Sequence, residues 1–387
     1  MTLLNWKRTP RARRSATNGA PPTNGAPSAN GAPPTNGAPS VNGTPSTNGA
    51  PTTNGAPSTT NGAPPSNKQP AAPVKDVRYL ALRNFAVSLT VLNIIGYTLL
   101  GFEQPPLWPI LAVATAYVTD LVFESIAAWS RDTTPRFLGN GARGVYEFLL
   151  PAHITAIAVN MLLYANNQFW PVLFAVVAAI TSKYVFQAPF GGRMRHFMNP
   201  SNFGITMALL FFSTWISIAP PYEFGENINT MFRIAVPLVL LVAGSVINAT
   251  LVGRIPLIVG WLGGFVIQAI VRHAVFDVAL VAALGTMTGT AFILFTNYMI
   301  TDPGTTPFPA RRQFMFGAAT ATVYGLMMAV NIVYTLFFAL TLVCAIRGIY
   351  AWLSTWAKAA RHRAEERRSA EQLPVLSPAP LPTTQRA

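Results

Sequence analysis

The stretch from Gly285 to Arg312 reads GTMTGTAFILFTNYMITDPGTTPFPARR, an apolar run rich in glycine and threonine that stops at Asp302-Pro303. A proline ends a helix because it lacks an N–H and its ring clashes with the preceding turn. Inside a membrane, the backbone groups that such a break frees need other partners, and broken helices often line binding sites. The stretch therefore predicts an interrupted membrane helix with a polar site at this position, which we call the Asp302 break.

The chain around this stretch is too apolar for a soluble protein. Hydrophobic residues make up 51% of it, although residues 1–75 contribute almost none. After Lys75, about ten runs are long enough to cross a hydrocarbon core of roughly 30 Å, some of them only if short or broken. They predict an all-α polytopic membrane protein with a ten-helix membrane domain over 76–357. The runs are residues 82–101, 107–129, 145–165, 169–188, 199–216, 232–252, 255–271, 278–300, 313–331 and 332–356.

The two ends of the chain differ from this domain. From Asn18 to Asn61 the tetrapeptide Asn-Gly-Ala/Thr-Pro recurs eight times, and such a composition cannot form a core. We expect residues 1–75 to be a disordered tail. Residues 358–387 are first basic and then Pro-rich, which predicts an interfacial helix extension followed by a cytoplasmic tail.

The net charge of +14 does not indicate nucleic-acid binding, because the cations lie at the termini and in short loops between apolar runs. Placing both termini in the cytoplasm puts most loop arginines inside, as the positive-inside rule requires. The single cysteine, Cys344, and four scattered histidines show no metal-ligand spacing. Redox chemistry in this chain would therefore need an organic cofactor.

Two carboxylates fall inside the second run. Asp120 and Glu124 are four residues apart and share one helix face, which suits a cation or proton pathway. The alternative is that both lie near the inner boundary and pair with Arg131, Arg136 or Arg143. Other polar residues in the runs are expected to make hydrogen bonds within the helix bundle: Asn93, Asn160, Asn248, Asn297 and His153.

Another break precedes the fifth run, in GGRMRHFMNPSNFG from Gly191 to Gly204, and we call it the Asn199 break. Asn199 is a good N-cap and Pro200 suits the first helical position, so a helix should begin here. A helix N-terminus flanked by Arg193 and Arg195 suits a phosphate or carboxylate. An ordinary capped helix preceded by positive-inside residues is the other interpretation.

The Asp302 break offers a matching set of polar groups. Asp302 can cap whatever follows Pro303, and Thr301, Thr305 and Thr306 supply hydroxyls around it. Residues 183–185 weakly echo residues 297–299, which raises the question of an internal duplication, inverted or parallel.

At these breaks the chain resembles the RnfD/NqrB family, which comprises membrane proteins of the Rnf electron-transport complex and of the sodium-translocating NADH:quinone oxidoreductase. The resembling residues are 199–204, NPSNFG, and Gly285-Thr286-Met287 running on to TDPGTT at 301–306. The likeness covers about residues 75–356. The beginning of the domain, ALRNFAVSLTVLNIIGYTLLGFEQPP, looks most similar to the branch called UnbU, found with enediyne biosynthesis genes.

The resemblance implies a ten-helix component of a bacterial inner-membrane redox complex, related in fold to urea transporters, that holds flavin. Classical members attach FMN through phosphate to a Thr in a Ser-Gly-Ala-Thr-like stretch, whereas the corresponding loop here offers only Thr214 and Thr230 in another context. FMN or riboflavin is therefore expected to bind noncovalently. Arg193, Arg195, Asn199, Asn202, Thr301, Asp302, Thr305 and Thr306 are the predicted cofactor-binding residues.

Three functions follow as hypotheses from these observations. The first is a membrane component of an electron-transfer assembly, holding flavin or quinone, with other redox subunits and the lipid membrane as partners. The second is a transporter or channel for a small solute, because the fold alone does not choose between them. The third is a membrane scaffold for biosynthetic enzymes, reached through the N-terminal tail.

Overall fold

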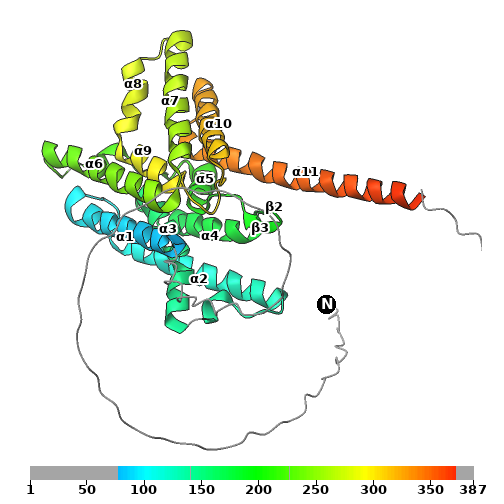
Figure 1. Ribbon diagram of the computed structural model, residues 1–387. Helices are drawn as coiled ribbons and strands as arrows, with labels where there is room; N and C mark the ends of the chain where they lie inside the picture. Colours follow the sequence, from blue (N-terminus) through cyan, green and yellow to red (C-terminus); the bar gives the residue numbers. More distant parts are fainter. Residues whose placement is uncertain (1–76, 140, 226, 372–387) are drawn as a thin grey trace, which may run out of the picture. The chain divides into compact units, whose positions relative to one another are not determined.

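The computed structural model describes residues 77–139, 141–225 and 227–371 (Figure 1). The predicted disorder of residues 1–75 and the Pro-rich end of the chain lie outside these residues. The described part is helical, apart from two short antiparallel ribbons, β1–β4 and β2–β3. The prediction of an all-α protein is confirmed for this part of the chain.

Eleven α-helices carry the described fold. Short 3₁₀ and π turns extend or join them, and the ribbons connect helix ends. The helices are α1 Val77–Ile95, α2 Leu107–Ser130, α3 Gly141–Leu162, α4 Trp170–Val185, α5 Pro200–Phe212, α6 Thr230–Ile247, α7 Ile255–Phe276, α8 Leu280–Gly285, α9 Thr290–Leu294, α10 Ala310–Ala329 and α11 Thr335–Glu371. The turns are η1 Gly96–Leu100, η2 Arg136–Leu138, η3 Pro221–Phe224, η4 Asn248–Val252, η5 Thr286–Thr288 and η6 Phe295–Met299. The strands are β1 Leu163–Tyr164, β2 Gln187–Phe190, β3 Arg193–His196 and β4 Ser217–Ile218.

Six described helical segments are long and apolar enough to cross a membrane, and the bent pair α8–α9 brings the number to seven. The chain therefore has the features of a multi-pass membrane protein. The predicted runs at 169–188 and 199–216 form the shorter helices α4 and α5, of 16 and 13 residues. The run at 313–331 forms α10, which is 20 residues long and does not reach the same apolarity.

The run at 278–300 contains a bend that its sequence did not predict. The axis turns by 64° between residues 280–288 and 290–299. Gly289 lies at the bend with an extended backbone (φ −70°, ψ 140°), so it both ends the short η5 turn and begins α9. The predicted break at Asp302-Pro303 is present as well, because the helix ends after η6 and α10 begins only at Ala310.

Three helix contacts in the first half of the described chain have counterparts in the second, whereas the contacts of α3 with α4 and α5 have none of similar extent. In the first half α1 packs on α3, α2 on α4 and α4 on α5; in the second α6 packs on α9, α7 on α10 and α10 on α11. Helices α1 and α6 also end alike, each in a π turn followed by a left-handed glycine, Gly101 or Gly253. These shared contacts match the first run with the sixth, and an internal duplication stays a prediction. The echo between residues 183–185 and 297–299 does not follow this pairing.

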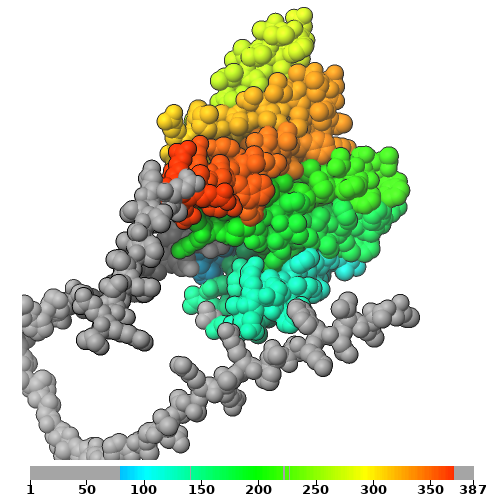
Figure 2. Space-filling model, turned by 90° about the vertical axis from the view of Figure 1, so that its right-hand side faces the viewer, coloured from blue at the N-terminus to red at the C-terminus, as the bar shows by residue number. Residues whose placement is uncertain are grey.

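The last two predicted runs are separate helices. Residues 330–334 join α10 to α11, and Asn331 and Tyr334 take positive φ angles of 58° and 59° there. The two helices contact each other, and the orange and red surfaces of this part of the chain adjoin in Figure 2. α11 continues to Glu371, so the basic stretch after residue 357 is helical as expected. Its predicted contact with lipid stays a prediction.

Helices α7 and α10 approach each other through two glycines. A Cβ placed on Gly317 of α10 would lie 2.2 Å from the Leu257 carbonyl oxygen, and one on Gly260 would lie 2.2 Å from the Phe314 carbonyl oxygen. Small residues allow such backbone contact between membrane helices, where packing replaces the hydrophobic effect as the driving force. This contact holds α7, and with it the loop before α7, in place beside the Asp302 break.

We expect Gly317→Ala to lower the stability of the purified protein in detergent by about 1–3 kcal/mol, because the new methyl group meets backbone atoms that cannot rotate away. A thermal unfolding curve measures the change. Gly263→Ala in α7 is the matched control, since nothing lies within 4 Å of its Cβ position. Equal melting temperatures for the two variants would contradict the close contact.

Candidate functional site

The two breaks meet in space. Asn199 caps α5 as predicted, with its Oδ1 accepting a hydrogen bond of 3.1 Å from the Asn202 N–H. The Nδ2 of the same side chain donates to the Met299 carbonyl at 2.7 Å, at the end of η6. One asparagine side chain thus pairs with a backbone N–H at the start of one helix and with a backbone carbonyl at the end of the other.

The Asp302 break folds into a tight polar turn. The Asp302 carboxylate accepts hydrogen bonds from the Gly304 N–H (3.0 Å) and the Thr305 hydroxyl (2.9 Å). The Asp302 carbonyl accepts one from the Thr306 hydroxyl at 2.7 Å. Asp302 therefore caps the turn over 302–306 and not α10, which begins after Pro309. Thr301, which is fully buried, donates to the Asn297 carbonyl.

The ribbon β2–β3 brings the Asn199 break over this turn. His196, at the end of β3, lies against Gly304, where a Cβ would be 2.8 Å from its Nε2. Arg195 is half-buried and lies 4.9 Å from the Phe308 ring centre. Arg193 lies at the other end of β3, beside the Gly191-Gly192 turn, and is exposed. The structure thus places Arg195 at the turn, whereas no described contact brings Arg193 there.

Two further arginines complete the site, and the sequence analysis assigned no function to either. Arg254, in the loop before α7, is buried, donates from Nε to the Thr306 hydroxyl (2.9 Å) and lies 5.2 Å from the Phe308 ring centre. Arg347 of α11 donates to the Thr305 carbonyl and lies 4.2 Å from the Phe190 ring centre. We call Arg195, Arg254 and Arg347 the arginine cluster.

The arginine cluster is electrostatically unusual. Burial lowers the pKa of Arg254, the nearby Asp302 raises it, and the positive charge of Arg195 lowers it again. Arg347 also interacts with both other arginines. An arginine inside an apolar run is a sign of function by default, and this signal was available in the sequence at Arg347.

Asn202, another predicted cofactor residue, makes structural contacts. It is almost fully buried, and its Nδ2 donates to the Phe337 carbonyl (2.9 Å) and the Thr341 hydroxyl (2.8 Å) of α11. These bonds fasten the start of α5 to α11. A role in binding a cofactor stays a prediction for this residue.

Asp120 and Glu124 lie in a separate network of ion pairs. Lys183 bonds both carboxylate oxygens of Asp120 at 2.8 and 2.9 Å, and the Tyr184 hydroxyl donates to the same carboxylate at 2.7 Å. Glu124 accepts from the Arg136 side chain at 2.9 Å, which raises the pKa of Arg136. The alternative pairing was thus correct for Glu124, whereas the partner of Asp120 is Lys183. An ion pathway through these residues stays a prediction.

Most of the remaining polar residues in the apolar runs behave as expected, but Asn93 does not, because its Nδ2 is buried without a hydrogen-bond partner among the described residues. His153 accepts or donates on both ring nitrogens, to the Thr90 and Tyr117 hydroxyls. Asn160 donates to the Tyr97 hydroxyl, and Asn248 donates to the Asn297 carbonyl. These bonds join different helical segments, as predicted.

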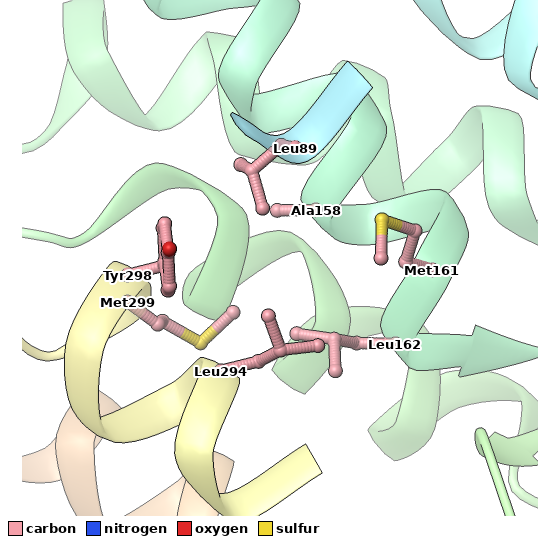
Figure 3. A pocket seen from close by; sticks show the side chains of 7 residues that line it. All are labelled: Leu89, Ala158, Met161, Leu162, Leu294, Tyr298 and Met299. Carbon is pink, nitrogen blue, oxygen red and sulfur yellow. The ribbon is translucent and has the colours of Figure 1, made fainter. Parts of the chain in front are cut away.

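A small apolar cavity lies beside the Asp302 break (Figure 3). Leu89, Ala158, Met161, Leu162, Leu294, Tyr298 and Met299 line it. Its volume of about 10 Å³ is about what one water molecule needs, so it is too small for an aromatic ring system. A planar cofactor would therefore not fit inside it.

A buried carboxyl group that the sequence analysis missed lies elsewhere, in η3. Glu223 is only 1% exposed, beside Phe224, whose ring packs edge-on against Phe102. The pKa of Glu223 is raised to about 7, chiefly by burial and also by the negative charge of Glu103. A hydrogen bond with Gln104 lowers the pKa and offsets part of this increase. Nothing in the local sequence distinguishes this residue from an exposed loop glutamate.

Comparisons of the chain with models of known protein families and with curated proteins found no match. The resemblance to the RnfD/NqrB family therefore stays a prediction that rests on the motifs at the two breaks.

We expect Asp120→Asn to destabilise the protein by about 3–5 kcal/mol, because it leaves the largely buried Lys183 without its carboxylate. Replacing the pair with apolar residues, Asp120→Leu with Lys183→Met, should restore most of this loss. Denaturant unfolding in detergent measures both. The control is Glu147→Gln, which breaks the more exposed pair with Arg143 and should cost less than about 1 kcal/mol. Similar losses for the two single variants would contradict the assignment.

We expect the stability of the protein to fall as the pH rises from about 4.5 to about 7. Over this range Glu223 stays protonated in the folded protein and is ionised in the unfolded chain, so folding is favoured most at the acid end. The contribution is up to about 3 kcal/mol, at 1.36 kcal/mol per pKa unit. Glu223→Gln should flatten this part of the pH profile, whereas Glu365→Gln on exposed α11 should not. An unchanged profile in Glu223→Gln would exclude the raised pKa.

Proposed function

We propose that the chain is a membrane component of a bacterial electron-transfer assembly and that it holds FMN or riboflavin noncovalently where its two helix breaks meet. The observation that carries the proposal is that the Asn199 break and the Asp302 break contact each other. The ribbon before α5, the turn over 302–306 and the arginine cluster form one polar region at the ends of apolar helices.

The aromatic side chains favour a planar ligand at this place. Phe308 is 58% exposed, although the guanidinium groups of Arg195 and Arg254 both lie close to its ring. A flat, electron-poor ring system can stack on phenylalanine and on guanidinium planes, which explains why these groups suit a flavin better than a small polar solute. In this proposal the isoalloxazine ring lies against Phe308.

The protein then supplies position and charge, and a bound flavin supplies one- and two-electron transfer. The Asp302 turn is held by its own hydrogen bonds and by Arg254 and Arg347, so the donors and acceptors around the ligand are already ordered. Positive charge around the site favours the reduced, anionic form of a flavin. The residues named here bind and orient; none of them needs to change its own oxidation state.

The proposal includes a membrane arrangement. Ten crossings, five in each half, agree with the contacts that the two halves share. An odd number of crossings in each half inverts the second half relative to the first, as in urea transporters. Both termini then lie in the cytoplasm, in the inner membrane of a bacterium, with the arginine cluster on the cytoplasmic side. Other proteins of the complex would deliver and remove electrons there.

We expect the protein, expressed in flavin-replete bacteria and purified in mild detergent, to show a visible flavin spectrum that passes through a filter after denaturation. Asp302→Asn with Arg195→Ala should lower the flavin content about tenfold, because the substitutions remove the turn's carboxylate and one stacked cation. Absorbance per protein measures this.

The matched control is Arg131→Ala with Asp132→Asn, the same change of side chains at the exposed end of α2. A control with full flavin content and a depleted site variant support the proposal. A colourless wild-type protein would overturn it and favour the transporter, which uptake of small solutes into liposomes then tests directly. Flavin that stays on the denatured protein would instead show a covalent link.

A further inference from the structure

The arginine cluster carries more positive charge than the described residues around it neutralise. Three guanidinium groups lie within electrostatic range of one another, and the carboxylate of the turn, that of Asp302, acts on Arg254 and already accepts hydrogen bonds from Gly304 and Thr305. The ion pairs among the described residues are Arg136–Glu124, Arg143–Glu147, Lys183–Asp120 and His362–Glu366, and none of them includes these arginines. The local balance is therefore about two positive charges.

Such an excess is costly where the charges are removed from water. Arg254 is 3% exposed, and Arg347 lies in the apolar helix α11. Cations inside a membrane protein are retained where they pair with an anion, with carbonyls or with a ligand. Here the carbonyl of Thr305 and the hydroxyl of Thr306 take one hydrogen bond each, and neither neutralises a charge.

The donors of the cluster are also largely unused by the described residues. A guanidinium group has five N–H donors. In the described part of the chain, the guanidinium group of Arg254 donates one hydrogen bond, through Nε, and that of Arg347 donates one, through Nη1. The guanidinium group of Arg195 donates none among these residues. The rings of Phe308 and Phe190, whose centres lie 4.2–5.2 Å from the guanidinium carbons, offer these groups no oxygen acceptor.

We propose that the arginine cluster binds the phosphate group of a ligand, with Arg254 and Arg347 as its principal partners and Arg195 as the third. A phosphate monoester carries about −1.5 to −2 charges near neutral pH, which matches the local excess, whereas a carboxylate carries only one. Arginine binds phosphate oxygens through two parallel hydrogen bonds, a geometry that lysine lacks. The inference rests on the proposed function only in naming FMN as the first ligand to try.

The phosphate group has two possible sources, a soluble ester such as FMN or the headgroup of an anionic lipid. Both present the same oxygens to the cluster. The experiment therefore measures each separately, on the full-length protein in neutral detergent, by isothermal titration with FMN, riboflavin and inorganic phosphate, and by binding to nanodiscs that contain phosphatidate or only phosphatidylcholine.

We expect flavin-free wild-type protein to bind FMN at least about tenfold more tightly than riboflavin, since only FMN has the phosphate. Arg254→Gln and Arg347→Gln should each weaken FMN binding much more than riboflavin binding, and so remove most of this difference. Arg361→Gln, which removes an exposed cation further along α11, is the control and should bind FMN as the wild type does. Arg254→Lys should recover only part of the affinity, because it restores charge and not the paired hydrogen bonds.

Other results separate this inference from the proposed function. If neither flavin binds, loss of phosphate or phosphatidate binding in Arg254→Gln and Arg347→Gln still supports the phosphate site, and the nanodisc result identifies lipid as the source. Equal affinities for FMN and riboflavin in the wild type, with no phosphate or phosphatidate binding, overturn it. The inference is also overturned if the cluster variants and Arg361→Gln lower the affinity for FMN or phosphate equally. Where Arg254→Gln does not fold, Arg195→Gln on the half-buried ribbon gives the same readout.

Discussion

The structure depends on a constraint that apolar surroundings impose on broken helices. Each helix that stops leaves backbone carbonyls or N–H groups unpaired, and outside water each unpaired group costs free energy. The hydrogen bond from Asn199 to the Met299 carbonyl meets this constraint for two helices at once. It joins residues that are a hundred positions apart in the chain.

The arginines extend the same solution to the loop beyond the break. Arg254 and Arg347 bond to Thr306 and Thr305, so cations from two other helical segments hold the turn that follows η6. Cations suit this place because the carbonyl end of a helix carries partial negative charge. One guanidinium can satisfy a carbonyl and still present free N–H edges, so structural and ligand-binding roles do not exclude each other here.

The sequence predicted the parts of the site that depend on local chemistry. Asn199 followed by proline indicates a helix start wherever it occurs, and Asp302-Pro303 indicates a helix end. The partners that come from distant segments could not be predicted in this way. Arg254 looked like an ordinary loop cation, and Lys183 was not considered for Asp120, because both contacts depend on how helices pack. The bend at Gly289 could not be predicted either, because glycine is also common in unbroken membrane helices.

The ends of the first and sixth runs, which share a π turn and a left-handed glycine, are followed by different polar contacts. After the left-handed Gly101, Gln104 reaches from the first half to the Leu163 carbonyl, at the end of the third run. After the corresponding Gly253, Arg254 reaches to Thr306, past the end of the eighth run. The bridging side chains, three residues after Gly101 and directly after Gly253, are thus neutral at one end, near the buried carboxyl of Glu223, and cationic at the other. The two bridges thus differ in charge, and if the arginine cluster binds a phosphate as proposed, the cationic bridge is the one that the anion would neutralise.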